Sequence, residues 1–259
     1  MQAVTSLPPM SDPHADQARS FDRVAGAYQR ARPSYPAAAV EWVLDAAPGR
    51  RVVDLAAGTG KLTEVLVAAG AEVTAGEPLA NMRAELERAL PSVRAIDGAA
   101  ERIPLPDERA DALFVGQAFH WFDRPAALEE IARVLVPGGA LGLVWNLRDE
   151  RVPWVAELTV ALRGAADVLA VSRGISERPL ESERFTAAER REFPNPVPFD
   201  RARLREWAAS TSRIAVLPER EREAALDGVV RLADEHPALA DRHTFDMPFV
   251  AVVVRARRR

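Results

Sequence analysis

The chain has 259 residues, a formal net charge of −4 and 48% hydrophobic residues. This length allows one large domain or two small ones, and the apolar content is ample for a packed core, which excludes a wholly disordered chain. There are no cysteines, which excludes disulfides, thiolate metal sites and cysteine nucleophiles. The four histidines lack metal-ligand spacing, so we expect no intrinsic metal site.

Charge and hydropathy also narrow the possible partners. An acidic chain lacks the basic footprint of a nucleic-acid-binding protein, and the arginines at 255–259 are expected to form a solvated tail. No apolar run is long enough to predict a membrane span. Residues 1–20 lack the basic and apolar regions of a signal peptide and are predicted to form a flexible arm. We therefore expect a cytoplasmic protein that binds neither nucleic acid nor membranes.

The first ordered elements are helical. Helical spacing begins at Phe21, prolines interrupt it at 33–36, and residues 37–47 favour a second short helix. Alternating strands and helices follow. Short apolar or β-branched runs predict strands at 51–55, 71–75, 93–96, 112–115 and 140–145, and helical spacing predicts helices at 61–69, 79–90 and 123–135. Repeated βα units of this kind are typical of a doubly wound α/β domain, with helices on both faces of a parallel sheet.

The alternation changes after Asn146. The pattern there predicts a long amphipathic helix at 152–169, a strand at 191–196, helices at 201–209 and 218–235, and an apolar last strand at 245–254. Because the last strand is expected to return to the sheet, the region before it is not a separate domain. We therefore predict one domain over 21–259, with 152–184 as a helical insertion or lid over the ligand crevice.

In an open α/β sheet, ligands bind outside the carboxyl ends of the strands. The first strand carries Asp54 near its end, and the following turn contains Gly58 and Gly60, which allow a tight bend and close approach of a ligand. The dinucleotide-binding pattern GxGxxG fails here in both registers, because Thr63 or Lys61 stands at the third glycine position.

Glu77 ends the second strand, where a carboxylate can accept both hydroxyls of a ribose. The alternative is a solvated acid in the turn before Pro78.

Residues 52–63 resemble motif I of the class I S-adenosylmethionine-dependent methyltransferases. The resemblance continues at 76–82, 98–107, 117–122 and 133–139, and residues 21–36 are similar to the N-terminal helical cap of the small-molecule (type 11-like) branch. The motifs follow one another from Phe21 to Asn146 in the family's order. The resemblance implies S-adenosylmethionine as cofactor, S-adenosylhomocysteine as product, and a Rossmann-like seven-stranded sheet whose last strand, 245–254, is antiparallel.

The resemblance also assigns roles in cofactor binding. Asp54 would receive the ammonium of the methionyl part, directly or through water, and Glu77 would take the ribose hydroxyls. The amides around Ala56, Gly58 and Gly60 would line the methionyl part and the sugar. Ala56 stands where glycine is more usual, which implies a slightly wider turn.

The remaining cofactor contacts surround the adenine and close the pocket. Relatives carry an acid where Ala99 stands, so backbone groups of Ala99 and Ala100, or the side chain of Asp97, would replace that contact. Tyr28, which could instead be a plain helix-face aromatic, and Arg32 would close the pocket. The other expected contacts are Pro78, Leu79, Met82 and Gln117, with Leu79 and Met82 flanking the adenine.

His120, between Phe119 and Trp121, is the best-placed candidate for a general base. The alternative is a structural histidine packed among aromatic rings. At the end of the fifth strand, Asn146 is expected on the substrate side and Trp145 in the core.

These observations predict a methyltransferase that acts on a small organic molecule by in-line displacement, as a monomer or homodimer. One rival is a nicotinamide-dependent dehydrogenase, disfavoured by the failed third glycine. Another is a non-catalytic S-adenosylmethionine-binding regulatory protein. A nucleic-acid methyltransferase is disfavoured by the acidic composition.

Overall fold

A computed structural model describes residues 33–163 and 180–259 of the chain. The expected arm at 1–20, the helix from Phe21, the candidates Tyr28 and Arg32, and residues 164–179 of the expected lid lie outside the described residues.

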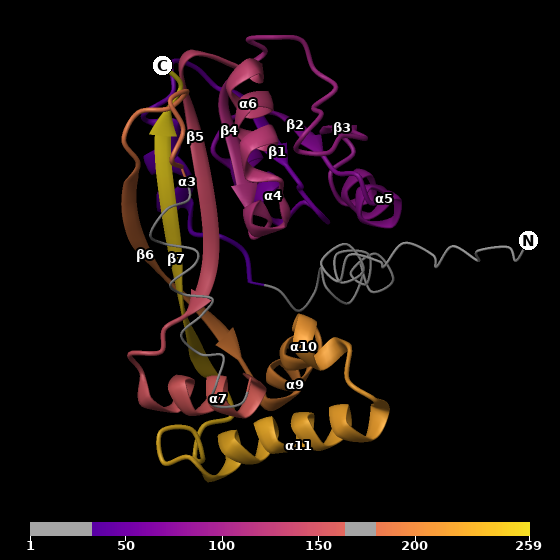
Figure 1. Ribbon diagram of the computed structural model, residues 1–259. Helices are drawn as coiled ribbons and strands as arrows, with labels where there is room; N and C mark the ends of the chain where they lie inside the picture. Colours follow the sequence, from indigo (N-terminus) through magenta and orange to yellow (C-terminus); the bar gives the residue numbers. More distant parts are fainter. Residues whose placement is uncertain (1–32, 164–179) are drawn as a thin grey trace, which may run out of the picture.

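The core of the fold is one seven-stranded sheet (Figure 1). Its order is β3-β2-β1-β4-β5-β7-β6, in which the first five strands run parallel and β7 pairs antiparallel with both β5 and β6. This confirms the doubly wound sheet with an antiparallel last strand. The strands are β1 (Arg51–Leu55), β2 (Glu72–Gly76), β3 (Arg94–Ile96), β4 (Ala110–Gly116), β5 (Leu135–Arg148), β6 (Glu189–Phe199) and β7 (Phe245–Arg257).

Helices cover both faces of the sheet because successive strand residues alternate between two apolar cores. On one face, α3 (Ala37–Leu44) and α4 (Lys61–Ala68) pack with Val144 and other residues of β5. On the other face, α6 (Arg124–Val134) packs over Leu143 and Trp145. Two further elements, α5 (Ala80–Ala89) and the short 3₁₀ helix η1 (Phe119–Trp121), follow β2 and β4.

The fifth strand is longer than the expected 140–145. It begins at Leu135, directly after α6, and runs to Arg148. The helix ends at Val134, before Pro137-Gly138-Gly139, which were expected to stop it. These residues instead form an irregularity inside the strand, where the β4–β5 register shifts between Ala110 and Ala112. Gly138 adopts a φ of +77°, which glycine accommodates without strain, and its N–H donates to the carbonyl of Arg258. Pairing with the neighbouring strands thus extends β5 beyond its apolar run.

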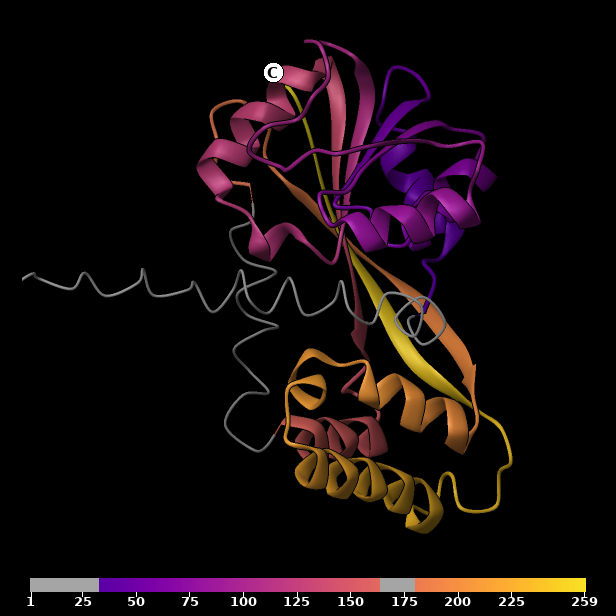
Figure 2. The same cartoon turned by 90° about the vertical axis from the view of Figure 1, so that its right-hand side faces the viewer.

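Beyond the carboxyl ends of the parallel strands lies a helical unit of α7 (Pro153–Arg163), α9 (Arg201–Ala209), α10 (Ser212–Ala215) and α11 (Glu219–Glu235) (Figures 1 and 2). Its core contains Trp154, Trp207 and Phe249, so the far ends of β6 and β7 belong to it as well. Among the described residues of the expected 152–184 lid, those of α7 pack here, whereas Leu180 is buried in the core under α6. Whether α7 covers a ligand stays a prediction. None of the described helices is long and apolar enough to cross a membrane.

The outer strand β6 carries proline at every second position from 194 to 198. Proline lacks an N–H, so it is tolerated in an edge strand only where that N–H would point away from the ladder. Asn195 and Val197 alternate with these prolines and pair with Phe249 and Met247 of β7.

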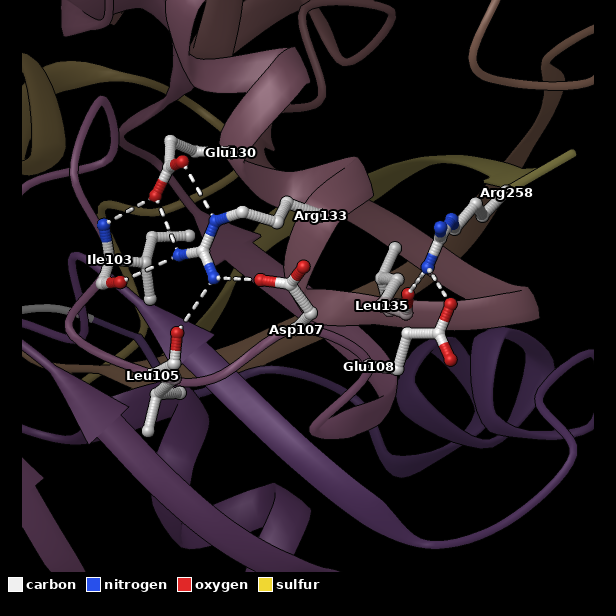
Figure 3. Close-up of polar contacts among 8 residues, drawn as sticks. All are labelled: Ile103, Leu105, Asp107, Glu108, Glu130, Arg133, Leu135 and Arg258. Carbon is white, nitrogen blue, oxygen red and sulfur yellow. Dashed lines mark hydrogen bonds and ion pairs between the residues drawn. The ribbon is translucent and has the colours of Figure 1, made fainter.

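Arg133 of α6 joins the segment between β3 and β4 to this helix (Figure 3). Its guanidinium donates to both carboxylate oxygens of Glu130 at 2.8 and 2.9 Å, to Asp107 at 2.8 Å, and to the carbonyls of Ile103 and Leu105 at 2.9 and 2.8 Å. The hydrogen bond to Glu130 contributes most to raising the pKa of Arg133, and Arg133 in turn lowers the pKa of Glu130.

A second arginine contact lies beside it (Figure 3). Arg258, the penultimate residue of the sequence, donates to the carbonyl of Leu135 and pairs with Glu108 at 3.3 Å.

Replacing Arg133 with Ala should lower the free energy of unfolding by about 2–4 kcal/mol, because it leaves two carbonyls and two carboxylates without their shared donor. Arg184 is a matched control, because it also pairs with a carboxylate of α6, Glu129, but both side chains are mostly exposed. Arg184→Ala should cost less than about 1 kcal/mol. Urea unfolding measures both, and equal losses would contradict this role of Arg133.

Candidate active site

The strand order reverses between β1 and β4, and open α/β sheets bind their ligands outside the carboxyl ends of the strands at such a point. The turn after β1 lies at this position and is built from left-handed residues. Ala56, Gly58 and Gly60 have φ values of 56°, 59° and 90°. A Cβ on Gly60 would lie 3.1 Å from a side-chain atom of Leu90, whereas one on Gly58 would meet no atom within 4 Å. Gly58 therefore faces open space, as a residue that borders a ligand must.

Two non-glycine residues at this edge adopt the left-handed conformation that L-residues rarely occupy. Ala56 follows β1, and Gln117, with a φ of 58°, follows β4. Ala56 thus keeps a glycine-like backbone in the turn where a slightly wider turn was expected. The backbone N–H of Gln117 donates to Val144 at 2.8 Å and its side chain to the carbonyl of Asn146 at 2.9 Å. Such strain concentrates at functional sites, where surrounding contacts hold it in place.

Glu77 connects the turn after β1 with the turn after β2. Its side chain is 4% exposed, and its two oxygens accept from the backbone N–H groups of Gly58 and Leu79, each at 2.8 Å. Because a carboxylate has about four acceptor directions, these two bonds do not by themselves saturate it. Because Glu77 is buried, the alternative of a solvated acid is wrong.

Asp54 is a fully buried carboxylate at the end of β1. Its Oδ2 accepts from the hydroxyl of Thr63 at 2.6 Å, and its Oδ1 has no hydrogen-bond partner in the part of the chain that the structure describes. The pKa of Asp54 is raised to about 7, mainly by burial; the hydrogen bond from Thr63 opposes this shift and the charge of Glu77 adds to it. An acid in this state gains most from a cationic hydrogen-bond donor at Oδ1.

The residues expected around the adenine follow β2 and β3. Leu79 is half-buried and Met82 is buried, whereas Pro78 is exposed. Ala99 is exposed and forms a short bridge with Arg102, and Ala100 is 5% exposed.

The other acid considered for the adenine contact, Asp97, is exposed and lies 3.5 Å from Arg83. Arg83 also donates to the carbonyl of Glu77 at 2.6 Å. Neither the Asp97 contact nor the backbone contact at Ala99 and Ala100 is tested by this arrangement, and both stay predictions.

His120 lies in η1, just beyond the carboxyl end of β4. Its ring is exposed and lies 4.6 Å from the ring of Trp121, centroid to centroid, while Phe119 beneath is buried. Trp145 is 2% exposed in the core, where it was expected to lie. The position of His120 beyond the end of β4 is compatible with contact to an acceptor, but its role stays a prediction.

Comparison with known proteins identifies the family. A profile of the methyltransferase domain matches residues 53–143. An uncharacterized methyltransferase of Mycobacterium tuberculosis is 44% identical over 241 residues, which cover 93% of this chain and 96% of the relative. This chain belongs to the class I S-adenosylmethionine-dependent methyltransferases.

Two further comparisons agree with this assignment. An uncharacterized methyltransferase of Schizosaccharomyces pombe is 34% identical to this methyltransferase and matches 82% of this chain and 88% of the relative. The structure of a putative type II methyltransferase from Anaeromyxobacter dehalogenans has a TM-score of 0.66 at 23% identity. It covers 88% of this chain and 97% of that chain, and shows the shared fold.

The site fits the family's cofactor, S-adenosylmethionine. The orphaned oxygen of Asp54 can accept from an ammonium, and the open side of Gly58 leaves room beside the carboxylate of Glu77. In the described residues, no group of histidine, aspartate and glutamate side chains could hold a metal ion.

Thr63 is a site residue whose role the sequence concealed, because it was noticed only as a failed third glycine. A glycine at that position would leave both oxygens of Asp54 without a side-chain donor. This methyltransferase places a hydroxyl group at the position where a dehydrogenase has a glycine for close packing. The dehydrogenase alternative is excluded, because the chain belongs to the methyltransferases.

Gly58→Val should abolish binding of S-adenosylhomocysteine, because a β-branched side chain would strain a φ of +59° and fill the open side of the turn. Gly70 provides the control, since it also has a positive φ of +78° with nothing within 4 Å but lies at the far end of α4. Gly70→Val should cost comparable stability and leave affinity unchanged in titration calorimetry. Normal binding by Gly58→Val would place the cofactor elsewhere.

Proposed function

We propose that this methyltransferase transfers a methyl group to a small organic acceptor, with its cofactor held across the carboxyl ends of β1, β2 and β4. In this proposal, Asp54 receives the ammonium and Glu77 the ribose hydroxyls, and the amides of Ala56, Gly58 and Gly60 line the methionyl part and sugar. The observation that carries the proposal is the buried, half-paired carboxylate of Asp54 beside the open glycine turn.

The remaining cofactor contacts in the proposal lie on either side of this centre. Leu79 and Met82 flank the adenine, with Pro78, Ala99 and Ala100 nearby. Gln117 contributes from β4. Tyr28 and Arg32 close the pocket from the N-terminal side.

The cofactor supplies a methyl group on a positively charged sulfur, which is already an activated leaving group. The protein is therefore required mainly to align the acceptor with that methyl group and to exclude water, an effect worth up to about 10⁵–10⁸ M in effective concentration. We place His120 on the acceptor side, where it would position the acceptor or remove its proton, a contribution of about 10²–10⁴-fold when a base is used.

The acidic chain favours a small acceptor over a nucleic acid. A net charge of −4 opposes the close approach of a polyanion, whose binding depends on many basic contacts. The aromatic turn Phe119–Trp121 beyond the end of β4 offers apolar contacts instead.

The Asp54 assignment predicts a distinctive pH dependence of S-adenosylhomocysteine binding. A ligand ammonium favours the ionised carboxylate, so the ligand binds the ionised form of Asp54 and lowers its pKa, which is about 7 in the free protein. Affinity should be highest above pH 8 and fall about tenfold as the pH drops from about 8 to about 6. Calorimetry at several pH values measures this.

Asp54→Asn is the control, because this variant lacks the carboxylate and the pH dependence of its affinity reports only the titration of the ligand. The variant should bind more weakly at pH 8 and lose the added pH dependence. Identical profiles for the two proteins would contradict contact between Asp54 and the ammonium.

The acceptor class can be tested without knowing the acceptor. The protein should be incubated with methyl-labelled S-adenosylmethionine and a whole-cell extract, which is then divided by ultrafiltration into small molecules and macromolecules. We expect label in the small-molecule fraction, and none there with Gly58→Val. Label confined to the protein or nucleic-acid fraction would refute a small acceptor.

A further inference from the structure

Two asparagines hold the first described residues of the chain. Asn195 of β6 donates to the carbonyl of Ser34 at 2.8 Å and to Oδ1 of Asn146 at 3.0 Å. Asn146 of β5 donates to the carbonyls of Ser34 and Pro33 at 3.0 and 3.4 Å. We call residues 33–36 the strap. The two amide side chains thus donate to the carbonyls of Pro33 and Ser34, and Asn195 also donates to Asn146.

The strap crosses the edge of the sheet at which the cofactor turn lies (Figures 1 and 2). A Cβ on Gly116, the last residue of β4, would lie 2.9 Å from the hydroxyl oxygen of Tyr35 and 3.1 Å from Leu62 of α4. Tyr35 therefore packs directly on the backbone at the end of β4, next to the left-handed Gln117. Gln117 in turn donates to the carbonyl of Asn146, so the strap and the end of β4 share one support.

The composition of the strap makes its position depend on these anchors. Pro33 and Pro36 fix their own φ angles and restrict the residues before them, so the strap moves as a stiff unit. The side-chain hydrogen bonds to the carbonyl of Ser34 come from strands β5 and β6, which motif I does not include, while the carbonyl of Pro36 accepts from Ala39 at the start of α3.

We propose that Asn195 is a positioning residue for methyl transfer. With Asn146 it fixes the strap, and the strap sets Tyr35 against Gly116, one residue before Gln117 and beside the first turn of α4. Asn195 touches neither the glycine turn nor Glu77, and it acts on the cofactor site through this contact. Without the hydrogen bonds of Asn195, Tyr35 moves away from Gly116 at the end of β4, the strand end that borders the proposed cofactor site.

Asn195→Asp is the sharpest test, because aspartate has the same shape as asparagine. It replaces the amide N–H groups with an oxygen that cannot donate to the carbonyl of Ser34 or to Oδ1 of Asn146. It should weaken S-adenosylhomocysteine binding about three- to thirtyfold, the equivalent of one to two ordinary hydrogen bonds. Asn195→Ala should behave alike. Glu192→Ala, on the same strand, removes surface ion pairs with Arg151 and Arg190 without touching the strap and should leave affinity unchanged.

Gly116→Ala provides an independent route to the same contact, because its methyl group would push Tyr35 away with both asparagines intact. Combined with Asn195→Asp, it should weaken binding by less than the product of the two single effects, since both act through Tyr35. Wild-type affinity retained in Asn195→Asp would overturn the proposal, as would loss of affinity only in proportion to a lowered melting temperature. These outcomes are separate from the proposed cofactor contacts, which fail if the wild-type protein does not bind S-adenosylhomocysteine, if Gly58→Val binds it normally, or if Asp54→Asn keeps the wild-type profile.

Discussion

The carboxylate of Glu77 holds together the two turns on which the cofactor site is built. Its oxygens bind the amides of Gly58 and Leu79, so the turn after β1 and the start of α5 share one acceptor. The charge that performs this structural task also raises the pKa of the nearby, fully buried Asp54. Two acids in a confined site are unfavourable for the free protein, and the arrangement is explained by a ligand that brings a cation and hydroxyl donors.

The cost of this arrangement has a definite pH dependence. The pKa of Asp54 in the folded protein, about 7, lies above the ordinary value of 3.8 that applies to the unfolded chain. The folded state therefore binds the extra proton, so this acid destabilises the free protein least at acidic pH. Stability declines as the pH rises from about 4 through about 7. A ligand ammonium at Oδ1 would offset this loss, which couples cofactor binding to the stability of the fold.

The local pattern was sufficient to predict the strands and most helices, because each depends on the apolar spacing of its own residues. The antiparallel direction of β7 was implied by the resemblance to the methyltransferase family. The local pattern could not predict that β5 begins at Leu135, since that extension depends on register with β4 and β7. The described residues of the expected insertion at 152–184 contribute to two different hydrophobic cores, which the local pattern also could not predict. The helix at 153–163 found its core with α9 and α11, whereas Leu180 found its own under α6.

In the site, Asp54, Glu77 and the glycines were recognisable because they lie near the end of a strand or in the turn that follows one. Asn195 was not, because a polar residue between prolines in an edge strand has no local sign of its partner Ser34, 161 positions away. A contact between residues far apart in the sequence also joins two of the motif segments, 98–107 and 133–139. The side chain of Arg133 binds the carbonyls of Ile103 and Leu105, so the two segments form one hydrogen-bonded cluster.

The prolines of β6 have a consequence for synthesis of the chain. This strand leaves the ribosome before β7, and an unpaired strand is able to pair with any neighbouring chain that offers N–H and carbonyl groups. At 194, 196 and 198 one edge of β6 offers carbonyls without N–H donors, so a continuous ladder can grow only along the other edge. That edge is the one β7 occupies in the finished sheet. The nascent strand thus has one side on which to pair, and its correct partner arrives from the same chain within a few dozen residues.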